Sequence, residues 1–224
     1  MGGYYSQRLS AERLRLCYEL APPKVQQYLQ AEVDYVKERI QDSDRVLELG
    51  CGYGRVLQKL AAHARFAVGI DSSLESLVLA RELLTDTASC CLVCMDAVML
   101  GFPDGLFDTV VCIQNGISAF HVDQRQLVAE AVRVTRPGGK ALFSSYADGF
   151  WEERLHWFRL QASHGLVGEI DVDATGNGVI VCRDGFQATT VGSEDFIALS
   201  ESLGVICSVT EVDGSSLFCE VEVR

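Results

Sequence analysis

The stretch that decides the fold is Val46-Leu-Glu-Leu-Gly-Cys-Gly-Tyr-Gly54. It begins within a short apolar run, Arg45 to Leu49, and passes through glycines at positions 50, 52 and 54 into an apolar helical pattern from Val56 to Leu60. An apolar run that ends in glycines is typical of a buried strand followed by a loop and a helix. Because glycine lacks a Cβ, the loop can turn sharply and a ligand can approach its backbone closely. We therefore predict a ligand-binding loop at the end of a buried strand.

Two classes of cofactor use a loop of this kind. The dinucleotide fingerprint requires glycines at positions 50, 52 and 55, but position 55 is Arg. Glu48 also discriminates, because its carboxylate would repel a pyrophosphate and attract a cationic ligand. Both residues argue against a dehydrogenase, which stays open as an alternative on the same fold.

Strand and helix signals alternate beyond the loop. Further strands are predicted at 67–70, 89–95, 109–113 and 141–146. Helical patterns occupy 7–40, with a break at Ala21-Pro22-Pro23, and then 74–84 and 124–134. Strands that alternate with helices in this way form a parallel sheet with helices on both faces.

The alternation changes in the last third of the chain. Phe150 to Ser163 is predicted to be a helix, and residues 166–191 alternate around two turn signals, which predicts a small antiparallel meander. A helix with Ser193 as its cap and a terminal hairpin over residues 205–223 follow. The predicted fold class is α/β: a doubly wound, mostly parallel seven-stranded sheet with helices on both faces, an antiparallel C-terminal hairpin, and a small antiparallel insertion before it.

Five motifs in order carry a family resemblance. The first is the glycine loop with Glu48, and the others are Val68-Gly-Ile-Asp71, Met95-Asp-Ala-Val98, Phe102-Pro-Asp-Gly-Leu-Phe-Asp108 and Val134-Thr-Arg-Pro-Gly-Gly-Lys140. Together they resemble the class I S-adenosylmethionine-dependent methyltransferases, whose first motif has the form E-x-G-x-G-x-G. Thr135 replaces the leucine that is usual in the last motif. The resemblance extends from about Val46 to Tyr146 and implies S-adenosylmethionine as the cofactor.

We expect a single methyltransferase domain over residues 1–224. Its expected parts are a helical N-terminal lid segment (1–40), the cofactor-binding core (41–147), a helix with a β-meander insertion (148–192), and a helix with the C-terminal hairpin (193–224).

The resemblance also implies a set of cofactor-binding residues. They are Glu48, Gly50, Cys51, Gly52, Gly54, Asp71, Ser72, Asp96, Ala97, Gln114 and Asn115. Asp71 lies about 20 residues beyond the glycine loop, where a carboxylate accepts two hydrogen bonds from a ribose. In similar methyltransferases the acid at Asp96 accepts a hydrogen bond from the adenine amino group, and the N–H of Ala97 contacts the ring.

The methyl acceptor has fewer signals. The segment from Gln114 to His121 follows the fourth strand of the core, where this fold has its crevice. His121 is either a general base or an exposed surface histidine, and Tyr146 is the second candidate catalytic residue. Tyr146 begins a group that either walls an acceptor pocket or packs the meander onto the core, with Asp148, Trp151, His156 and Trp157. At the N-terminus, Tyr4, Tyr5 and Arg8 form either a lid over the cofactor or a frayed tail.

The nine cysteines lie mostly in apolar runs, where a free thiol behaves as a small buried hydrophobe. Cys91 and Cys94 form a single C-x-x-C without a second pair of matching spacing, so no metal site is predicted, and we expect both side chains in the core. Reduced thiols, together with the absence of an apolar signal-like segment at the start, favour a cytoplasmic protein without a membrane span.

The charge balance restricts the partners. Nineteen Lys and Arg residues against 31 Asp and Glu residues give a formal net charge of −12, and no basic patch is visible. Such a surface repels phosphate backbones, so nucleic acid is disfavoured. We predict direct methyl displacement onto a small-molecule acceptor. A protein or RNA acceptor, a thiol or metalloid acceptor, and a non-catalytic cofactor-binding module stay open, as does the oligomeric state.

Overall fold

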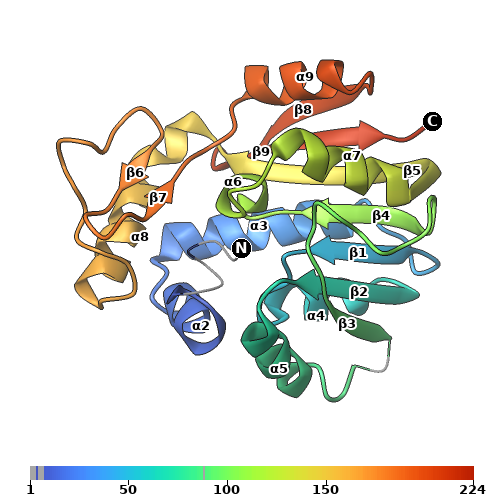
Figure 1. The fold of residues 1–224 in the computed structure, drawn as a ribbon, viewed down its shortest axis with the longest axis horizontal. Coiled ribbons are helices and arrows are strands. Elements are labelled where there is room, and N and C mark those ends of the chain that lie inside the picture. Colours follow the sequence, from blue (N-terminus) through green and yellow to red (C-terminus); the bar gives the residue numbers. More distant parts are fainter. Residues whose placement is uncertain (1–3, 5–7, 88) are drawn as a thin grey trace.

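A computed structural model describes residues 4, 8–87 and 89–224. Its centre is a seven-stranded sheet with the strand order β3-β2-β1-β4-β5-β9-β8 (Figure 1). The strands are β1 (Arg45–Leu49), β2 (Phe66–Asp71), β3 (Cys90–Cys94), β4 (Phe107–Cys112), β5 (Thr135–Tyr146), β8 (Cys207–Val212) and β9 (Ser216–Glu222). The first five are parallel, and β9 runs antiparallel between β5 and β8. The predicted fold class is confirmed.

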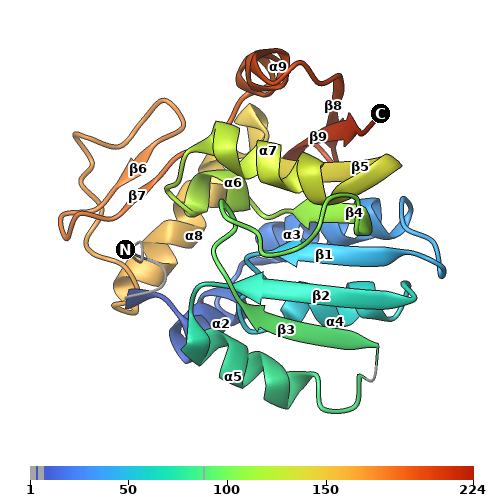
Figure 2. The same ribbon diagram turned by 45° about the vertical axis from the view of Figure 1, so that its right-hand side comes forward.

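Helices cover both faces of the sheet (Figure 2). One face packs against α3 (Pro23–Lys37), α4 (Arg55–Ala61) and α5 (Leu74–Leu83), and the other against α7 (Gln124–Val134) and α9 (Ser193–Ser202). Strand β1 supplies both cores by alternation. Val46 belongs to the cluster with α3 and α4, whereas Leu47 and Leu49 belong to the cluster with α7 and α9.

Three elements lie beside the sheet, at the left of Figure 1. These are α2 (Ala11–Glu19), α8 (Trp151–Ser163) and a separate two-stranded antiparallel sheet of β6 (Ile180–Val181) and β7 (Gln187–Ala188). Leu9 and Cys17 pack with Phe158 and Phe186 in one apolar cluster, so the start of the described chain is joined to the insertion. These elements extend beyond the carboxyl ends of β1, β2 and β4, where α2 and α8 form part of the wall of a cavity.

Some local predictions need correction. Gly192, not Ser193, is the N-cap of α9, and its backbone N–H donates to the Asp195 carboxylate at 3.0 Å. Strand β5 begins at Thr135 rather than Ala141, because Thr135 already pairs with Phe107 on β4, and the register shifts before the next pair, Lys140 with Thr109. The short helix α6 (Gly116–Ala119) was not predicted, since four residues are too few to show a helical period.

The cysteine prediction was wrong for Cys91 and Cys94. Both side chains are exposed, because β3 is an edge strand that carries neighbouring structure on only one side. Within the described residues no group of His, Cys, Asp and Glu has the geometry of a metal site. The described helices also include none that is long and apolar enough to span a bilayer.

Candidate functional site

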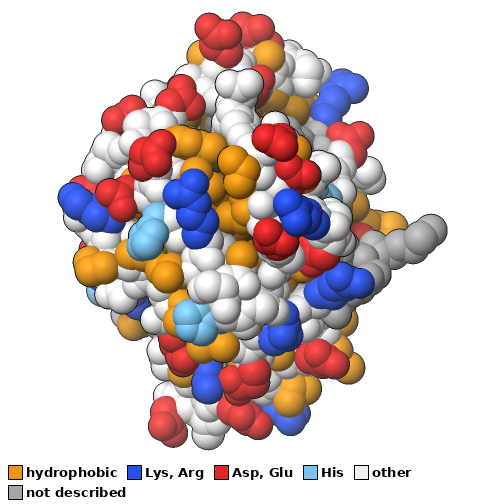
Figure 3. Space-filling view, turned by 90° about the vertical axis from the view of Figure 1, so that its left-hand side faces the viewer, with side chains coloured by type: hydrophobic (Ala, Val, Ile, Leu, Met, Phe, Trp, Pro, Cys, Tyr) orange, Lys and Arg blue, Asp and Glu red, His pale blue; other side chains and the backbone are white. Residues whose placement is uncertain are grey.

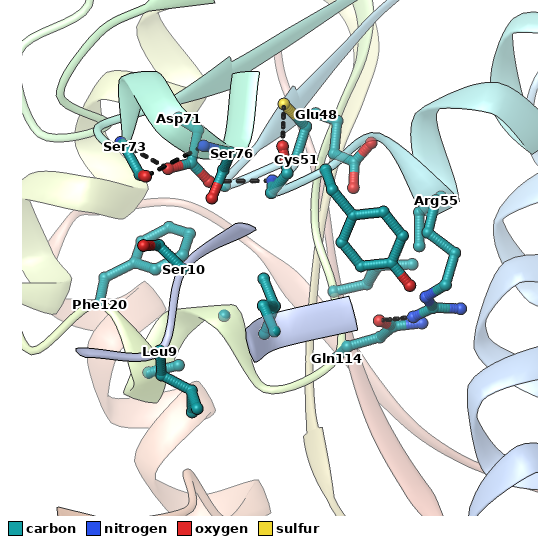
Figure 4. Close-up of a pocket in the computed structure, with 18 of the residues that line it drawn as sticks. Leu9, Ser10, Glu48, Cys51, Arg55, Asp71, Ser73, Ser76, Gln114 and Phe120 are labelled. Atoms are coloured by element: carbon teal, nitrogen blue, oxygen red, sulfur yellow. Dashed lines mark hydrogen bonds between the residues drawn. The ribbon is translucent and has the colours of Figure 1, made fainter. Parts of the chain in front are cut away.

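A cavity of about 350 Å³ opens at the carboxyl ends of β1, β2 and β4. The strand order reverses between β1 and β4, and in open α/β sheets this switch point is where ligands bind. The cavity wall comes from the glycine loop, from the ends of β2, β3 and β4, and from the N-terminal segment and α8 (Figure 4). Its volume lies within the range of small-molecule sites.

Most of the predicted cofactor residues line this cavity. They are Glu48, Gly50, Cys51, Gly52, Asp71, Ser72, Asp96, Ala97 and Gln114. Gly54 and Asn115 do not line it. The sheet explains the convergence, because the loops that follow parallel strands meet at one edge.

The three loop glycines have positive φ angles of 73°, 52° and 87°, and each has a different neighbour. A Cβ at Gly50 would overlap the Phe120 ring, and one at Gly54 would lie 3.2 Å from the Ala80 Cβ on α5. Gly52 lines the cavity, where a Cβ would lie 3.0 Å from Leu14 Cδ2. Gly54 therefore serves helix packing, and Gly52 is the glycine that keeps space free for a ligand.

Asp71 connects the loop to β2. One carboxylate oxygen accepts from the Gly52 N–H at 2.9 Å and the other accepts from the Ser73 N–H at 2.8 Å. Burial raises the pKa of Asp71, and the backbone donors oppose that rise. Each oxygen keeps a lone pair for a further donor, such as a ribose hydroxyl. Asp71 thus orders the glycine loop in addition to facing the cavity.

An acidic and a basic side chain line the cavity without forming an ion pair. Glu48 is 5% exposed and its Oε2 has no hydrogen-bond partner, and burial raises the pKa of its carboxyl to about 8. The Arg55 guanidinium lies 4.1 Å from the centre of the Tyr18 ring and donates to Gln114 Oε1, while its Nε is buried without a partner. Among the described residues no ion pair neutralises either group. A ligand that carries both charges would satisfy them.

Arg55 was missed as a site residue, because the sequence analysis used it only as a position that lacks glycine. A usable signal existed. Arg55 is the first residue of α4, where the helix dipole disfavours a cation, so its presence there needs a compensating contact.

The turn after β4 separates the roles of Gln114 and Asn115. Gln114 reaches the cavity and accepts from Arg55. The Asn115 side chain instead donates to the Thr189 carbonyl at 2.9 Å and accepts from Ser145 Oγ at 2.9 Å. Asn115 therefore joins the insertion to the sheet. The sequence around Asn115 did not predict this role, because both partners are distant along the chain.

The two candidate catalytic residues differ in placement. His121 is exposed and does not line the cavity. Tyr146 is buried, lines the cavity, and stacks on Tyr28 with ring centroids 4.9 Å apart. Burial raises the pKa of Tyr146 above that of a free phenol, so its hydroxyl is protonated near neutral pH.

The other aromatic candidates divide between two cavities. Trp157 lines the first, and its Nε1 donates to the Cys17 carbonyl at 2.9 Å. Asp148 and Trp151 line a neighbouring cavity of about 420 Å³, which shares Tyr146 with the first. His156 is exposed and lines neither.

Among the described residues, the N-terminal cover of the cavity begins at Leu9. The covering residues are Leu9, Ser10, Leu14, Cys17 and Tyr18. Tyr4 instead packs on Phe186 and donates to Asp184, Arg8 lies near the same carboxylate, and Tyr5 lies outside the described residues. The Ala11 N–H donates to Ser76 Oγ at 3.0 Å, which joins the covering segment to α5.

Comparison with known proteins supports this geometry. The family profile described as "Methyltransferase domain" matches residues 46–139, from β1 to the Pro-Gly-Gly turn. These residues form a class I methyltransferase domain. S-adenosylmethionine is the cofactor of that class, so the fold and cofactor predictions agree with the family.

Two curated relatives and one solved structure illustrate the similarity. The chain is 29% identical over 150 residues to 2-methyl-6-phytyl-1,4-hydroquinone methyltransferase of Synechocystis sp., which covers 59% of this chain and 46% of that protein. It is 35% identical over 114 residues to malonyl-[acyl-carrier protein] O-methyltransferase of Erwinia billingiae, with 50% and 43% covered. The chain thus spans less than half the length of these relatives. A SAM-dependent methyltransferase structure from Aquifex aeolicus shares the fold at a TM-score of 0.64 and 14% identity, covering 94% of this chain and 98% of that one.

Proposed function

We propose that this protein transfers a methyl group from S-adenosylmethionine to a small-molecule acceptor. The observation that carries the proposal is the cavity at the β1–β4 switch point, where the Glu48 carboxyl and the Arg55 guanidinium each have a buried polar atom without a hydrogen-bond partner and the N-terminal segment forms part of the wall. The donor has a cationic sulfonium and a methionine end with one ammonium and one carboxylate. The charges in the cavity suit such a molecule.

Each wall of the cavity has a role in this proposal. Glu48 would face the positive groups of the donor, and Arg55 its carboxylate. Asp71 would accept from the ribose hydroxyls, and Asp96 and the backbone of Ala97 would contact the adenine. The chemistry the donor supplies is an already activated methyl group. The protein then needs to align the acceptor, hold it at the methyl carbon and keep water out.

The covered cavity supports a small acceptor over a macromolecular one. Leu9 and Leu14 from the N-terminal segment and Trp157 from α8 form part of the cavity wall, which leaves a space of small-molecule size. The face of α8, β6 and β7 carries acidic and basic side chains intermixed, without a continuous basic area (Figure 3). One of the two relatives is named for methylation of a hydroquinone and the other for methylation of malonyl-[acyl-carrier protein], an acceptor carried on a protein. We assign neither of these acceptors to this protein.

A base is not required by this arrangement. An acceptor with a free lone pair can lose its proton to solvent after transfer, and the described residues that line the cavity include no histidine. Tyr146 is the titratable side chain best placed on the acceptor side, and as a neutral phenol it would orient the acceptor by a hydrogen bond.

The test has two parts. Calorimetry with S-adenosylmethionine and S-adenosylhomocysteine should give micromolar dissociation constants and one site per chain. A panel of small amines, thiols, hydroxyl compounds and carboxylates should then yield S-adenosylhomocysteine with at least one member. Binding without turnover across a broad panel would favour a non-catalytic module. A crystal structure in which the cofactor sulfur faces a flat open surface would favour a macromolecular acceptor.

A further inference from the structure

A buried carboxylate lies directly behind the cavity. Glu32 of α3 is 0% exposed, and three donors from three other segments converge on it. The backbone N–H of Gln114 donates to it at 2.6 Å, Ser144 Oγ on β5 donates at 2.8 Å, and Ser216 Oγ on β9 also donates. One side chain therefore connects α3 with the ends of β4, β5 and β9.

Burying this carboxylate is costly. Desolvation raises its pKa to about 7, although the hydrogen bonds oppose the rise, and no cation among the described residues pairs with it. Well-packed apolar side chains would join the same elements at lower cost in free energy. A purely structural role does not explain why a carboxylate occupies this position.

The bond to Gln114 offers an explanation. Gln114 and Asn115 have φ angles of 57° and 62°, and two consecutive non-glycine residues in the left-handed region are strained. The Gln114 N–H is held by Glu32 and also donates to Ser144 Oγ at 2.8 Å. With its N–H drawn to α3, the Gln114 side chain points into the cavity, where it accepts from Arg55.

We propose that Glu32 is a positioning residue, which holds the strained turn after β4 so that Gln114 orients Arg55 for the donor. It acts without touching the ligand. The proposal rests on the proposed function for its ligand, but the conformation of the turn can be observed without any ligand.

The first experiment measures binding. In Glu32→Gln the amide keeps the shape of the side chain but has one acceptor oxygen in place of two, so the Gln114 N–H and the two serine hydroxyls can no longer all donate to it. We expect the dissociation constant of S-adenosylhomocysteine, measured by calorimetry, to rise about tenfold. The matched control is Glu220→Gln on β9, which loses hydrogen bonds from Arg39 and Lys140 far from the turn. It should lower the melting temperature and leave the dissociation constant unchanged.

A double-mutant cycle distinguishes a positioning role of Glu32 from a contribution to overall stability. Gln114→Ala removes the side chain through which Glu32 acts, so Glu32→Gln should weaken binding little further in that background. Independent, additive losses would overturn the proposal, as would wild-type affinity in Glu32→Gln. If Glu32→Gln does not fold, Ser144→Ala removes the second acceptor of the same N–H and is judged by the same criteria.

The pH dependence gives another readout. The ionised carboxylate accepts all three donors, so wild-type affinity should increase as pH rises through about 7. The titratable groups facing Glu32 are Tyr28 on its own helix, Cys112 on β4 and Tyr146 on β5, and burial raises the pKa of each, so they are neutral in this range. From β9 the facing group is the non-titratable Ser216. Glu48 titrates in both proteins, so the difference between the wild-type and Glu32→Gln profiles isolates Glu32.

A crystal structure of each protein without ligand completes the test. We expect Gln114 to leave the left-handed region in Glu32→Gln and its bond to Arg55 to be lost. An unchanged turn would refute the positioning role even if no cofactor bound. Failure of the wild type to bind either cofactor form would instead refute the proposed function. The comparison of the two ligand-free structures would still show whether Glu32 holds the turn.

Discussion

The proposed donor side and the proposed acceptor side of the cavity are built in different ways. On the donor side, the loops after β1, β2 and β3 lie within the segment from 46 to 139 that matches the methyltransferase family. On the acceptor side, the N-terminal segment, Tyr146 and α8 lie outside that segment and meet only through tertiary packing. Short-range geometry fixes the proposed donor site, so single substitutions there should strongly weaken cofactor binding. Single substitutions on the proposed acceptor side should have smaller effects on binding and turnover.

The largest effect is expected at the glycine loop. Gly52→Val would place a branched side chain in the cavity at a φ of 52°, and strain in this region costs about 1–3 kcal/mol. We expect calorimetry to detect no binding of S-adenosylhomocysteine. Gly165→Val is the matched control, because Gly165 has a φ of 66° and nothing within 4 Å of a Cβ. It should show a similar loss of stability with normal binding. Normal binding in Gly52→Val would mean that the loop is only a structural turn.

The next effect tests Asp71. Asp71→Ala removes the acceptor of the Gly52 N–H together with the expected partner of the ribose. A lost charge-assisted hydrogen bond costs about 1.5–3 kcal/mol, so the affinities for donor and product should both fall by one to two orders of magnitude. Asp171→Ala, at an exposed turn within the insertion, serves as the control. Equal affinities of wild type and Asp71→Ala would show that the ribose lies elsewhere.

Glu48 should show opposite effects on stability and binding. Its folded pKa of about 8 lies above the ordinary 4.5, so the folded protein retains a proton that the unfolded chain releases. That contribution to stability is complete below about pH 4.5 and is lost as pH rises through 8. Glu48→Gln cannot ionise, so its stability does not fall in this pH range. At pH 9 we expect its free energy of unfolding to exceed that of the wild type by about 1–2 kcal/mol, which corresponds to a rise of about 2–8 °C in melting temperature.

The same substitution should weaken binding, because the amide no longer attracts the cationic groups of the donor. We expect about a tenfold rise in the dissociation constant of S-adenosylmethionine. Glu169→Gln, at an exposed carboxylate of the insertion, should change neither quantity. A Glu48→Gln protein that is less stable at pH 9 than the wild type would contradict the assigned burial cost.

The sequence predicted the two sides unequally for physical reasons. A buried strand followed by glycines fixes the loop geometry within ten residues, and Glu48, Gly52 and Asp71, which were predicted to bind the cofactor, line the cavity. Glu32 and Arg55 act through partners at positions 114, 144 and 216, and no local pattern encodes such contacts. These two residues were therefore missed.

Errors in the predictions had the same origin. Asn115 was assigned to the cofactor because it follows Gln114, but the left-handed turn sends its side chain to the insertion. Cys91 and Cys94 were assigned to the core because their neighbours are apolar, yet the sheet ends at their strand. Both outcomes depend on which segments become neighbours in space, and a single sequence records that only where a known motif is present.

The smallest effect is expected at His121, and it tests whether the acceptor side has been located correctly. His121 has the residue type of a general base, but it is exposed and lies outside the cavity wall. Surface substitutions change free energies by about 0.5 kcal/mol or less, so His121→Ala should retain turnover within about twofold. His164→Ala, at the exposed end of α8, is the matched control. The measurement is the initial rate of S-adenosylhomocysteine formation with an acceptor found in the panel, from pH 6 to 9.

A tenfold loss of turnover in His121→Ala would contradict this expectation. It would mean that the segment between α6 and α7 moves over the cavity when the acceptor binds. Tyr146→Phe provides the contrast, because its ring lines the cavity and only its hydroxyl is removed. If Tyr146 orients the acceptor, this variant should raise the Michaelis constant of the acceptor and leave that of S-adenosylmethionine unchanged. The two variants thereby distinguish a base, His121, that would have to move into the cavity from a hydrogen-bonding group, Tyr146, that already lines it.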